Sequence, residues 1–347
     1  MQDTMVIKQC LDKLLSESDT VFIVPHERPD MDALGASLGM ASICKKNNKK
    51  YYIVINEELE KIESATRRVL EKIGSEFNII KLADVEKLIT DDSLMLAIDV
   101  NKTYRIHTRD LLDRFKNIMI IDHHKTDEHT IKTDYIFTDE TLSSTCEEVS
   151  RLVFAYDAPI SNAQANCLLG GIILDTNRHS INVSPRTFDV DAELLRRGAN
   201  TTVANGLFLK DFKSDRLVQR LIDNTIIVEP NYAIAPDKDD SGITYKVEDI
   251  GKAADYLLDF NVMITFAIAR IDEETISVSA RSKGQIDVSR IMKLLSEKSG
   301  GSPCMAAAQI KGKSISEVRD YLNNLLSSPL LLEKETGMKL SRKNDWK

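Results

Sequence analysis

Short apolar runs alternate with longer stretches of mixed polarity in the first half of the chain. Runs that are short and continuously apolar are typical of strands buried on both faces of a sheet. They occupy residues 21–25, 51–55, 94–98 and 118–121. Between them, the spacing of the larger apolar residues predicts helices over 33–46 and 64–73. This alternation predicts an α/β fold with a parallel sheet covered by helices.

The second half of the chain is helical at first and mixed afterwards. Helix-like stretches follow one another from about 143 to 220. Beyond them, 262–270 and 275–280 have the pattern of strands, whereas 288–298 and 316–326 have that of helices. We therefore predict a first domain over 1–210, a helical linker over 211–225, a smaller α/β domain over 226–330 and a polar, basic, frayed tail over 331–347.

Composition and charge limit the classes of function that the chain can have. The 347 residues are 42% apolar and 29% charged, an ordinary globular balance. The formal net charge of −8 opposes binding to long duplex DNA, which requires a basic surface. The apolar runs are far shorter than the roughly 20 residues of a membrane span, and the N-terminus lacks the pattern of a signal peptide. Five scattered cysteines without a CxxC pair indicate reduced thiols and a cytoplasmic location.

Acidic and histidine residues follow three of the predicted strands. Ligands of parallel sheets bind beyond the carboxyl ends of the strands, so these positions are candidates for chemistry. A further acid, Asp175, follows the helix predicted over 162–174. A single Asp after a strand most often caps the next helix, but three strand ends with the same residue types point to one common site. The strand-end residues are His26, Asp30, Asp32, Asp99, Asp122, His123 and His124.

These residue types indicate a metal site. Carboxylates and imidazoles without thiolates suit manganese, magnesium, iron or zinc. The candidate ligands are too many for one ion and fit two ions that share a carboxylate, although one ion with a layer of supporting residues is the alternative. Two ions would activate water for an in-line displacement at phosphorus. The candidate ligands are His26, Asp30, Asp32, Asp99, His123 and Asp175.

The order and spacing of these motifs resemble the DHH phosphoesterase family. The resemblance begins with the segment from His26 to Gly35, Asp99, the triplet Asp122-His123-His124 and Asp175, and continues through 184–189, 194–199, 279–282 and 306–309. The chain looks most like the catalytic module of the membrane-anchored cyclic-di-AMP phosphodiesterases of bacteria. The transmembrane, PAS and GGDEF segments that precede this module in those proteins are not seen here, so we expect a fragment or a stand-alone relative.

The resemblance implies a fold and a set of roles. The fold is a Rossmann-like DHH domain and a smaller α/β DHH-associated domain with a cleft between them. The cofactors are two Mn²⁺ ions, for which Mg²⁺ or another divalent ion could substitute. The ligands implied are His26 and Asp30 for one ion, Asp32, His123 and Asp175 for the other, and Asp99 as the bridge.

Further roles are implied outside the ligand set. Asp122 orients its neighbours, and His124 donates a proton or contacts phosphate, with a supporting structural role as the alternative. In the second domain, Arg281 and the adjacent Ser282 are expected to contact phosphate, with an unliganded surface arginine as the alternative.

One loop departs from the family pattern. The family's second domain carries a GGGH-type loop that approaches the substrate, and here Ser302 stands where its histidine would be. Gly300 and Gly301 still allow backbone N–H groups to approach a phosphate or base, whereas Pro303 stiffens the loop. We expect the departure to affect substrate affinity and choice rather than hydrolysis itself.

The function implied by the resemblance is hydrolysis of cyclic di-AMP to pApA. The partners implied are a cyclic dinucleotide or short oligonucleotide and a second copy of the chain in a homodimer. Three alternatives are an enzyme for short RNA oligomers or pAp, a non-catalytic nucleotide sensor, and a processive single-strand exonuclease. His107, His129 and His179 lie outside the motifs and receive no role.

Overall fold

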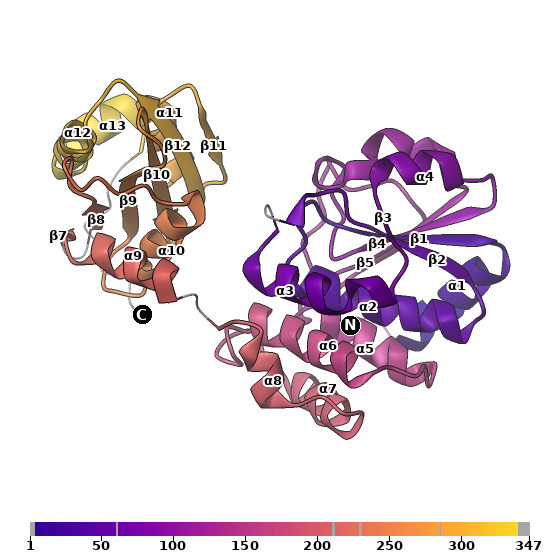
Figure 1. Cartoon of the computed structure of the whole chain (residues 1–347). Coiled ribbons are helices and arrows are strands. Elements are labelled where there is room, and N and C mark those ends of the chain that lie inside the picture. Colours follow the sequence, from indigo (N-terminus) through magenta and orange to yellow (C-terminus); the bar gives the residue numbers. More distant parts are fainter. Residues whose placement is uncertain (1–3, 60–61, 210–211, 229–230, 285, 339–347) are drawn as a thin grey trace. The chain divides into compact units, whose positions relative to one another are not determined.

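The computed structural model describes residues 4–338 apart from 60–61, 210–211, 229–230 and 285. The chain forms two compact units, Met1–Leu209 and Lys210–Lys347 (Figure 1). Each unit has its own sheet and its own apolar core. The two-domain α/β organisation predicted from the sequence is confirmed, and the cleft between the domains stays a prediction.

Six strands of the first unit form one parallel sheet in the order β3-β2-β1-β4-β5-β6. The strand order reverses between β1 and β4, which is the point where sheets of this kind bind ligands. The four strands predicted from apolar runs are present as β1, β2, β4 and β5. The bounds are β1 (Thr20–Pro25), β2 (Lys50–Val54), β3 (Ile79–Ile80), β4 (Ser93–Ile98), β5 (Asn117–Asp122) and β6 (Tyr135–Thr138).

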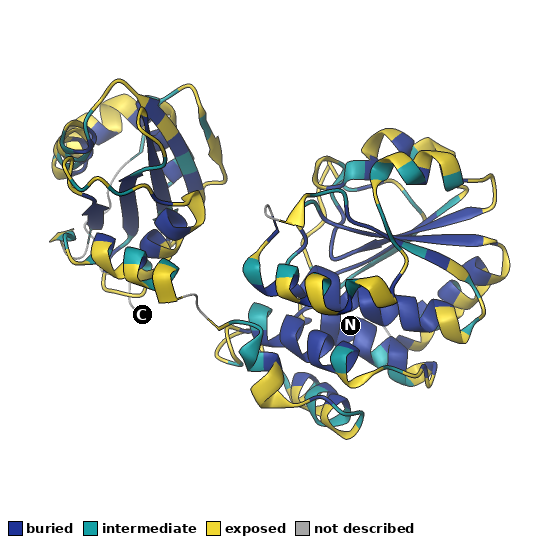
Figure 2. Ribbon diagram, viewed as in Figure 1, coloured by how far each residue is buried: buried dark blue, intermediate teal, exposed yellow. Residues whose placement is uncertain are grey.

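Helices cover both faces of this sheet. Val21 and Ile23 of β1 lie in one apolar core, and Phe22 and Val24 lie in another, so the strand is apolar throughout. Figure 2 shows the strands buried and the helices exposed on their outer faces. The α-helices are α1 (Thr4–Ser16), α2 (Met31–Lys46), α3 (Ser64–Ile73), α4 (Leu82–Leu88), α5 (Thr145–Ala155), α6 (Asn162–Asp175), α7 (Pro185–Arg196) and α8 (Thr201–Gly206). Short 3₁₀ helices are η2 (Gly74–Glu76), η3 (Thr103–Arg105) and η4 (His107–Arg114).

Helix α2 packs very closely against α6. All residues from 31 to 44 of α2 are buried. A Cβ atom on Gly35 would lie 2.6 Å from the carbonyl oxygen of Cys167, so only glycine allows the two backbones to approach this far. This close packing fixes Asp32 in the first turn of α2 relative to Asp175 at the end of α6.

The second unit contains a mixed sheet in the order β11-β12-β10-β9-β8-β7. β8 and β9 pair in parallel, and the other neighbours pair antiparallel. The strands are β7 (Ile226–Val228), β8 (Tyr232–Pro236), β9 (Ile264–Arg270), β10 (Thr275–Ser282), β11 (Ser299–Gly301) and β12 (Met305–Lys311). The helices are α9 (Phe212–Ile222), α10 (Val247–Leu258), α11 (Val288–Leu295), α12 (Ile315–Ser327) and α13 (Pro329–Thr336).

Two segments of the second unit differ from the sequence-based expectation. The segment expected as a linker contains α9, whose Val218 and Leu221 are buried in a core of the second unit. Helix α13 extends into the segment expected as a frayed tail over 331–347, and Leu332 of this helix packs into the same unit. The rest of the predicted tail, 339–347, lies outside the described residues. Among the residues described, none of the helices combines the length and apolar character that a bilayer crossing requires.

Candidate metal centre

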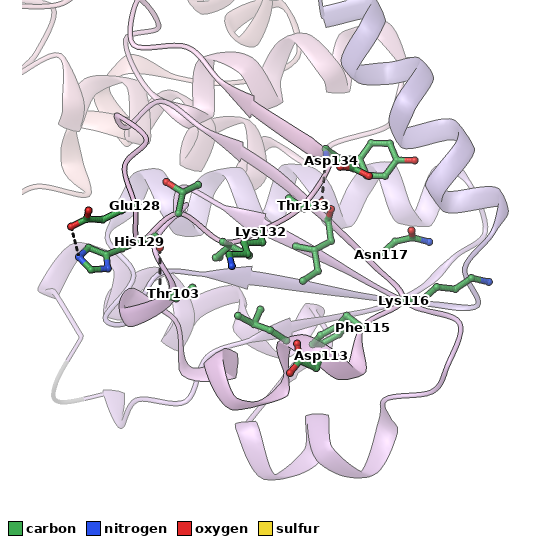
Figure 3. A pocket seen from close by; sticks show the side chains of 15 residues that line it. Thr103, Asp113, Phe115, Lys116, Asn117, Glu128, His129, Lys132, Thr133 and Asp134 are labelled. Atoms are coloured by element: carbon green, nitrogen blue, oxygen red, sulfur yellow. Dashed lines mark hydrogen bonds and ion pairs between the residues drawn. The ribbon is translucent and has the colours of Figure 1, made fainter.

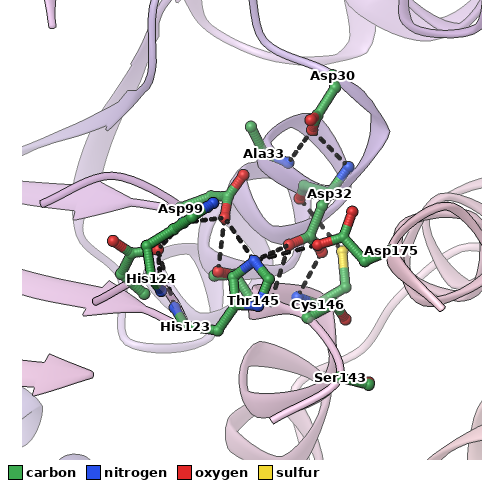
Figure 4. Close-up of polar contacts among 12 residues, drawn as sticks. Asp30, Asp32, Ala33, Asp99, His123, His124, Ser143, Thr145, Cys146 and Asp175 are labelled. Atoms are coloured by element: carbon green, nitrogen blue, oxygen red, sulfur yellow. Dashed lines mark hydrogen bonds and ion pairs between the residues drawn. The ribbon is translucent and has the colours of Figure 1, made fainter. Parts of the chain in front are cut away.

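The carboxyl edge of the first sheet collects the acidic and histidine residues. His26 follows β1 directly, Asp99 follows β4, and Asp122 ends β5. These three strands are neighbours in the sheet. Asp30 caps the N-terminus of α2, and Asp175 is the last residue of α6. The fold therefore brings side chains from distant stretches of sequence to one place (Figure 4).

His26, Asp30 and Asp99 form one group of potential ligands. Nε2 of His26 lies 3.5 Å from Oδ2 of Asp99 and 3.7 Å from Oδ2 of Asp30. Nδ1 of His26 donates a hydrogen bond of 2.7 Å to the carbonyl of Glu27, so the Nε2 lone pair faces the two carboxylates. An imidazole nitrogen and two carboxylates within 4.8 Å of one another are a donor set for a divalent cation.

Asp32, His123 and Asp175 form a second group. Nε2 of His123 lies 3.1 Å from Oδ2 of Asp175 and 3.9 Å from Oδ2 of Asp32. The three residues each offer a ligand atom within 4.8 Å of the others. Like the first group, this one consists of one imidazole and two carboxylates.

Asp99 lies between the two groups. Its Oδ2 faces His26, whereas its Oδ1 lies 3.6 Å from Nε2 of His123. The residue has a left-handed backbone with φ of 58°, a conformation that is uncommon outside glycine and is found at constrained functional positions. One carboxylate with an oxygen toward each group has the arrangement of a bridging ligand.

The N-terminus of α5 holds two of these carboxylates. The carboxylate of Asp32 accepts hydrogen bonds from the backbone N–H groups of Thr145 (2.8 Å) and Cys146 (2.7 Å). Oγ1 of Thr145 also donates to Oδ1 of Asp99 at 2.9 Å. The N–H groups of a helix N-terminus favour negative charge. The sequence analysis did not predict these contacts. The feature of the sequence that could have indicated them is Ser144, which caps the N-terminus of α5.

Asp122 organises the histidines that follow it. Its Oδ1 accepts hydrogen bonds from the backbone N–H of His123 (2.8 Å), the backbone N–H of His124 (3.2 Å) and Nδ1 of His124 (2.7 Å). Nδ1 of His124 therefore carries the proton, and its Nε2 belongs to a side chain that is 45% exposed. Asp122 thus sets both the orientation and the tautomer of His124.

Crowding of carboxylates perturbs the protonation of the site. Burial and the charge of Asp175 raise the pKa of Asp32 to about 7. Burial and the charges of Asp32 and Asp30 raise the pKa of Asp99 well above its usual range. Burial acts to lower the pKa of His123, but the hydrogen bond to Asp175 and the charge of Asp32 outweigh it and raise the pKa to about 9.

These residues fit divalent cations. Oδ2 of Asp122 is buried without a hydrogen-bond partner among the described residues. Buried polar atoms without partners are rare, and cations would both coordinate such atoms and relieve the repulsion among the carboxylates. The donor set of oxygen and imidazole nitrogen suits the ions expected from the sequence.

Comparison with known proteins places the chain in a family. The sequence profile of the DHH family, N-terminal domain, matches residues 20–172, and that of the DHHA1 domain matches residues 237–328. The chain belongs to the DHH family. The cyclic-di-AMP phosphodiesterase GdpP of Bacillus subtilis is 33% identical over 92% of this DHH chain and 49% of GdpP. The bifunctional oligoribonuclease and PAP phosphatase NrnA of Mycoplasma genitalium is 28% identical over 59% of this chain and 63% of NrnA.

Solved structures share the fold of this DHH chain. An exopolyphosphatase-related protein of Bacteroides fragilis superposes with a TM-score of 0.74 at 22% identity, over 95% of this chain and 98% of that one. The exonuclease RecJ bound to manganese superposes with a TM-score of 0.52 at 11% identity, over 94% of each chain. The DHH chain spans about half the length of GdpP, with 49% of that protein covered.

In the DHHA1 domain, the predicted phosphate-binding arginine is already paired. Nε of Arg281 donates to Oδ1 of Asp255 at 2.5 Å, and a terminal nitrogen reaches Oδ2 at 3.3 Å. The other terminal nitrogen donates to the carbonyl of Ala280 at 3.1 Å. Ser282 accepts a hydrogen bond from the backbone N–H of Gly284 at 3.1 Å. A phosphate at Arg281 would have to share the guanidinium with Asp255 or displace it.

The expectation of a glycine loop over 300–303 is wrong in part. Gly300 and Gly301 lie in the edge strand β11 and pair with β12. The turn that follows is closed by a hydrogen bond of 2.7 Å from the backbone N–H of Ser302 to the carbonyl of Met305. Gly301 has φ of 135°, and a Cβ there would lie 2.2 Å from that carbonyl oxygen, so the turn requires glycine.

A separate cavity of about 620 Å³ lies in the DHH domain (Figure 3). It is lined by residues of η4, by Lys116 and Asn117 at the start of β5 and by the segment 128–135. None of the predicted site residues lines it. The cavity is therefore distinct from the metal centre.

Proposed function

We propose that the chain is a phosphodiesterase that hydrolyses cyclic di-AMP to pApA. The observation that carries the proposal is Asp99, which turns one carboxylate oxygen toward each of two ligand groups. GdpP, which is named for this activity, is 33% identical over 92% of the chain. We place the activity in the cytoplasm, in keeping with the five free cysteines.

We assign two Mn²⁺ ions to the metal centre, with Mg²⁺ as a weaker substitute. His26, Asp30 and Asp99 would hold one ion, and Asp32, His123, Asp175 and Asp99 would hold the other. When bound, the pair supplies activated water and neutralises charge on the phosphate. RecJ, a protein of the same fold, carries manganese in its crystal structure.

The remaining residues have roles in binding and proton transfer. Asp122 holds Nδ1–H of His124, so that the exposed Nε2 contacts phosphate or, when it carries a second proton, donates that proton to the leaving 3′-oxygen. Arg281 and Ser282 bind a phosphate oxygen of the substrate, and this requires a rearrangement of the pair with Asp255. We assign Gly300, Gly301 and Ser302 to the substrate side of the domain, without the imidazole of the family loop and with the backbone N–H of Ser302 already bonded to the carbonyl of Met305.

The experiment that tests the proposal separates the candidate substrates. The purified protein with Mn²⁺ is incubated with cyclic di-AMP, cyclic di-GMP, pApA and pAp, and the products are resolved by chromatography. We expect cyclic di-AMP to be opened to pApA faster than any other substrate is consumed. Faster cleavage of pApA or pAp would instead assign an activity like that named for NrnA, and no cleavage of any of the four would refute a phosphodiesterase.

A pair of histidine variants provides the control. His124→Ala should reduce the rate by about 10²–10⁴-fold, because positioned proton transfer contributes that much. His129→Ala removes an exposed histidine beyond the motif, whose Nε2 lies 3.7 Å from the carboxylate of Glu128. Its rate should equal that of the unmodified protein.

A further inference from the structure

A fourth strand end lies beside the loop that carries the predicted ligands His26 and Asp30. Glu57 lies three residues beyond β2, which is the neighbour of β1 in the sheet. Its side chain is only 7% exposed. Such burial of a carboxylate requires partners. One partner, Arg28, lies in the loop that carries the ligands His26 and Asp30, and the other, His107, begins η4.

The Glu57 side chain contacts the backbone of Arg28 and the ring of His107 through the same carboxylate oxygen. Oε1 accepts a hydrogen bond of 2.6 Å from the backbone N–H of Arg28 and lies 2.5 Å from Nε2 of His107. Arg28 is midway between the two ligands and has a left-handed backbone with φ of 54°. Glu57 thus fixes the residue at which the ligand loop is conformationally strained.

His107 and its neighbours hold the same loop from a second side. The backbone N–H of Glu27 donates to the carbonyl of Arg105 at 2.7 Å. The carboxylate of Glu27 accepts a hydrogen bond of 2.7 Å from Arg109 and lies 3.5 Å from Nδ1 of His107. The imidazole of His107 therefore lies between two carboxylates, that of Glu27 in the loop and that of Glu57 beyond β2.

We propose that Glu57 and His107 are positioning residues that hold the His26–Asp30 loop in the geometry needed to bind the first of the two cations. The inference rests on the proposed metal centre. Neither side chain is one of the predicted ligands, and the effect passes through the backbone N–H of Arg28 and the side chain of Glu27. The carbonyl of Glu27 in turn orients the ring of His26. The two residues thus determine the affinity of one cation position.

Calorimetric titration of Mn²⁺ into the metal-free protein tests the proposal. In Glu57→Ala we expect one of two binding events to weaken by about tenfold to hundredfold, the range known for residues that support metal ligands. Asp30→Asn identifies which event belongs to the first position. The other event, at Asp32, His123 and Asp175, should change by less than about twofold, because its ligands make no contact with Glu57.

Two further variants separate positioning from general stability. Glu57→Gln retains a carbonyl oxygen for the N–H of Arg28 and should restore most of the affinity. Glu317→Ala is the matched control, since its carboxylate also accepts a backbone N–H at 2.6 Å, from Ser314, but at the start of α12 in the other unit. This control should leave both binding events unchanged.

Kinetics provide a second readout. The Mn²⁺ concentration for half-maximal activity should rise in Glu57→Ala and in His107→Ala, and kcat at saturating Mn²⁺ should remain close to normal. Unchanged binding events in folded Glu57→Ala would overturn the proposal, as would equal weakening of both events together with a lower melting temperature. Calorimetry needs no nucleotide, so the result holds even if cyclic di-AMP is not the substrate.

Discussion

Gly171 of α6 offers a sharp test of how the metal centre is supported. It lies four residues before Asp175 and faces the first turn of α2. A methyl group on Gly171 would lie 2.4 Å from Sγ of Cys146, 2.8 Å from Oδ1 of Asp32 and 2.9 Å from the Cα of Asp32. Gly171→Ala therefore pushes directly on a predicted ligand and on the helix end that holds it.

The size of the effect follows from the overlap. Non-bonded atoms prefer separations of about 3.5–4.0 Å, so the sulfur of Cys146 must move by about 1 Å or more. Overpacking of this kind costs about 1–3 kcal/mol, whereas glycine to alanine within a helix gains up to about 1 kcal/mol. We expect a net loss of about 1–2 kcal/mol, or roughly 2–8 °C in the melting temperature of a unit of this size.

Thermal unfolding and Mn²⁺ titration of the metal-free protein measure the two consequences. Displacement of Asp32 from the N–H groups of Thr145 and Cys146 should weaken Mn²⁺ binding by about tenfold, which corresponds to about 1.4 kcal/mol. Gly206→Ala is the control, because a Cβ there meets no atom within 4 Å. Wild-type melting and Mn²⁺ affinity in Gly171→Ala would refute the reasoning.

The remaining predictions concern catalysis, metal, substrate loop and pH. Asp122→Ala combined with His123→Ala should abolish hydrolysis while circular dichroism stays native, and normal turnover would show the site assignment to be wrong. EDTA should stop hydrolysis and Mn²⁺ should restore it better than Mg²⁺, whereas indifference to chelation would exclude the mechanism. Ser302→His should lower the KM for cyclic di-AMP, and an unchanged KM would mean that the turn does not face the substrate. In the metal-free protein, stability should fall as pH rises from about 4 to about 9. The folded state raises the pKa of Asp32 to about 7 through burial and the charge of Asp175. It raises that of His123 to about 9, because Asp175 and Asp32 outweigh burial. Each group therefore binds its proton more tightly when folded, and a melting temperature that stays constant or rises over this range would contradict the assignment.

The central strands could be predicted because burial on both faces requires apolar residues at successive positions. β1, β4 and β5 are buried on both faces and are therefore continuously apolar. β3 has two residues and β11 is Ser-Gly-Gly, so their pairing depends on a neighbouring strand rather than on their own side chains. Local pattern could not identify them.

The predicted ligand residues lie close together for a related reason. A parallel sheet delivers the residues after each strand to one edge, so the order of the strands alone brings Asp99 and His123 together. The pairing of Arg281 with Asp255 had no such signal, because it depends on how α10 packs on β10.

The parts of the site that sequence reasoning missed share one physical feature. Asp32 is held by the N–H groups of Thr145 and Cys146, and Glu57 holds the N–H of Arg28. Almost every residue type has a backbone N–H, so these contacts place no demand on residue identity at the donor and leave no motif. The predicted ligand set can therefore be recognised in a sequence, whereas the backbone contacts that we propose to position it depend on the three-dimensional path of the chain. Under this proposal, two chains with identical ligands differ in metal affinity through a residue such as Glu57, which lies outside the predicted ligand set.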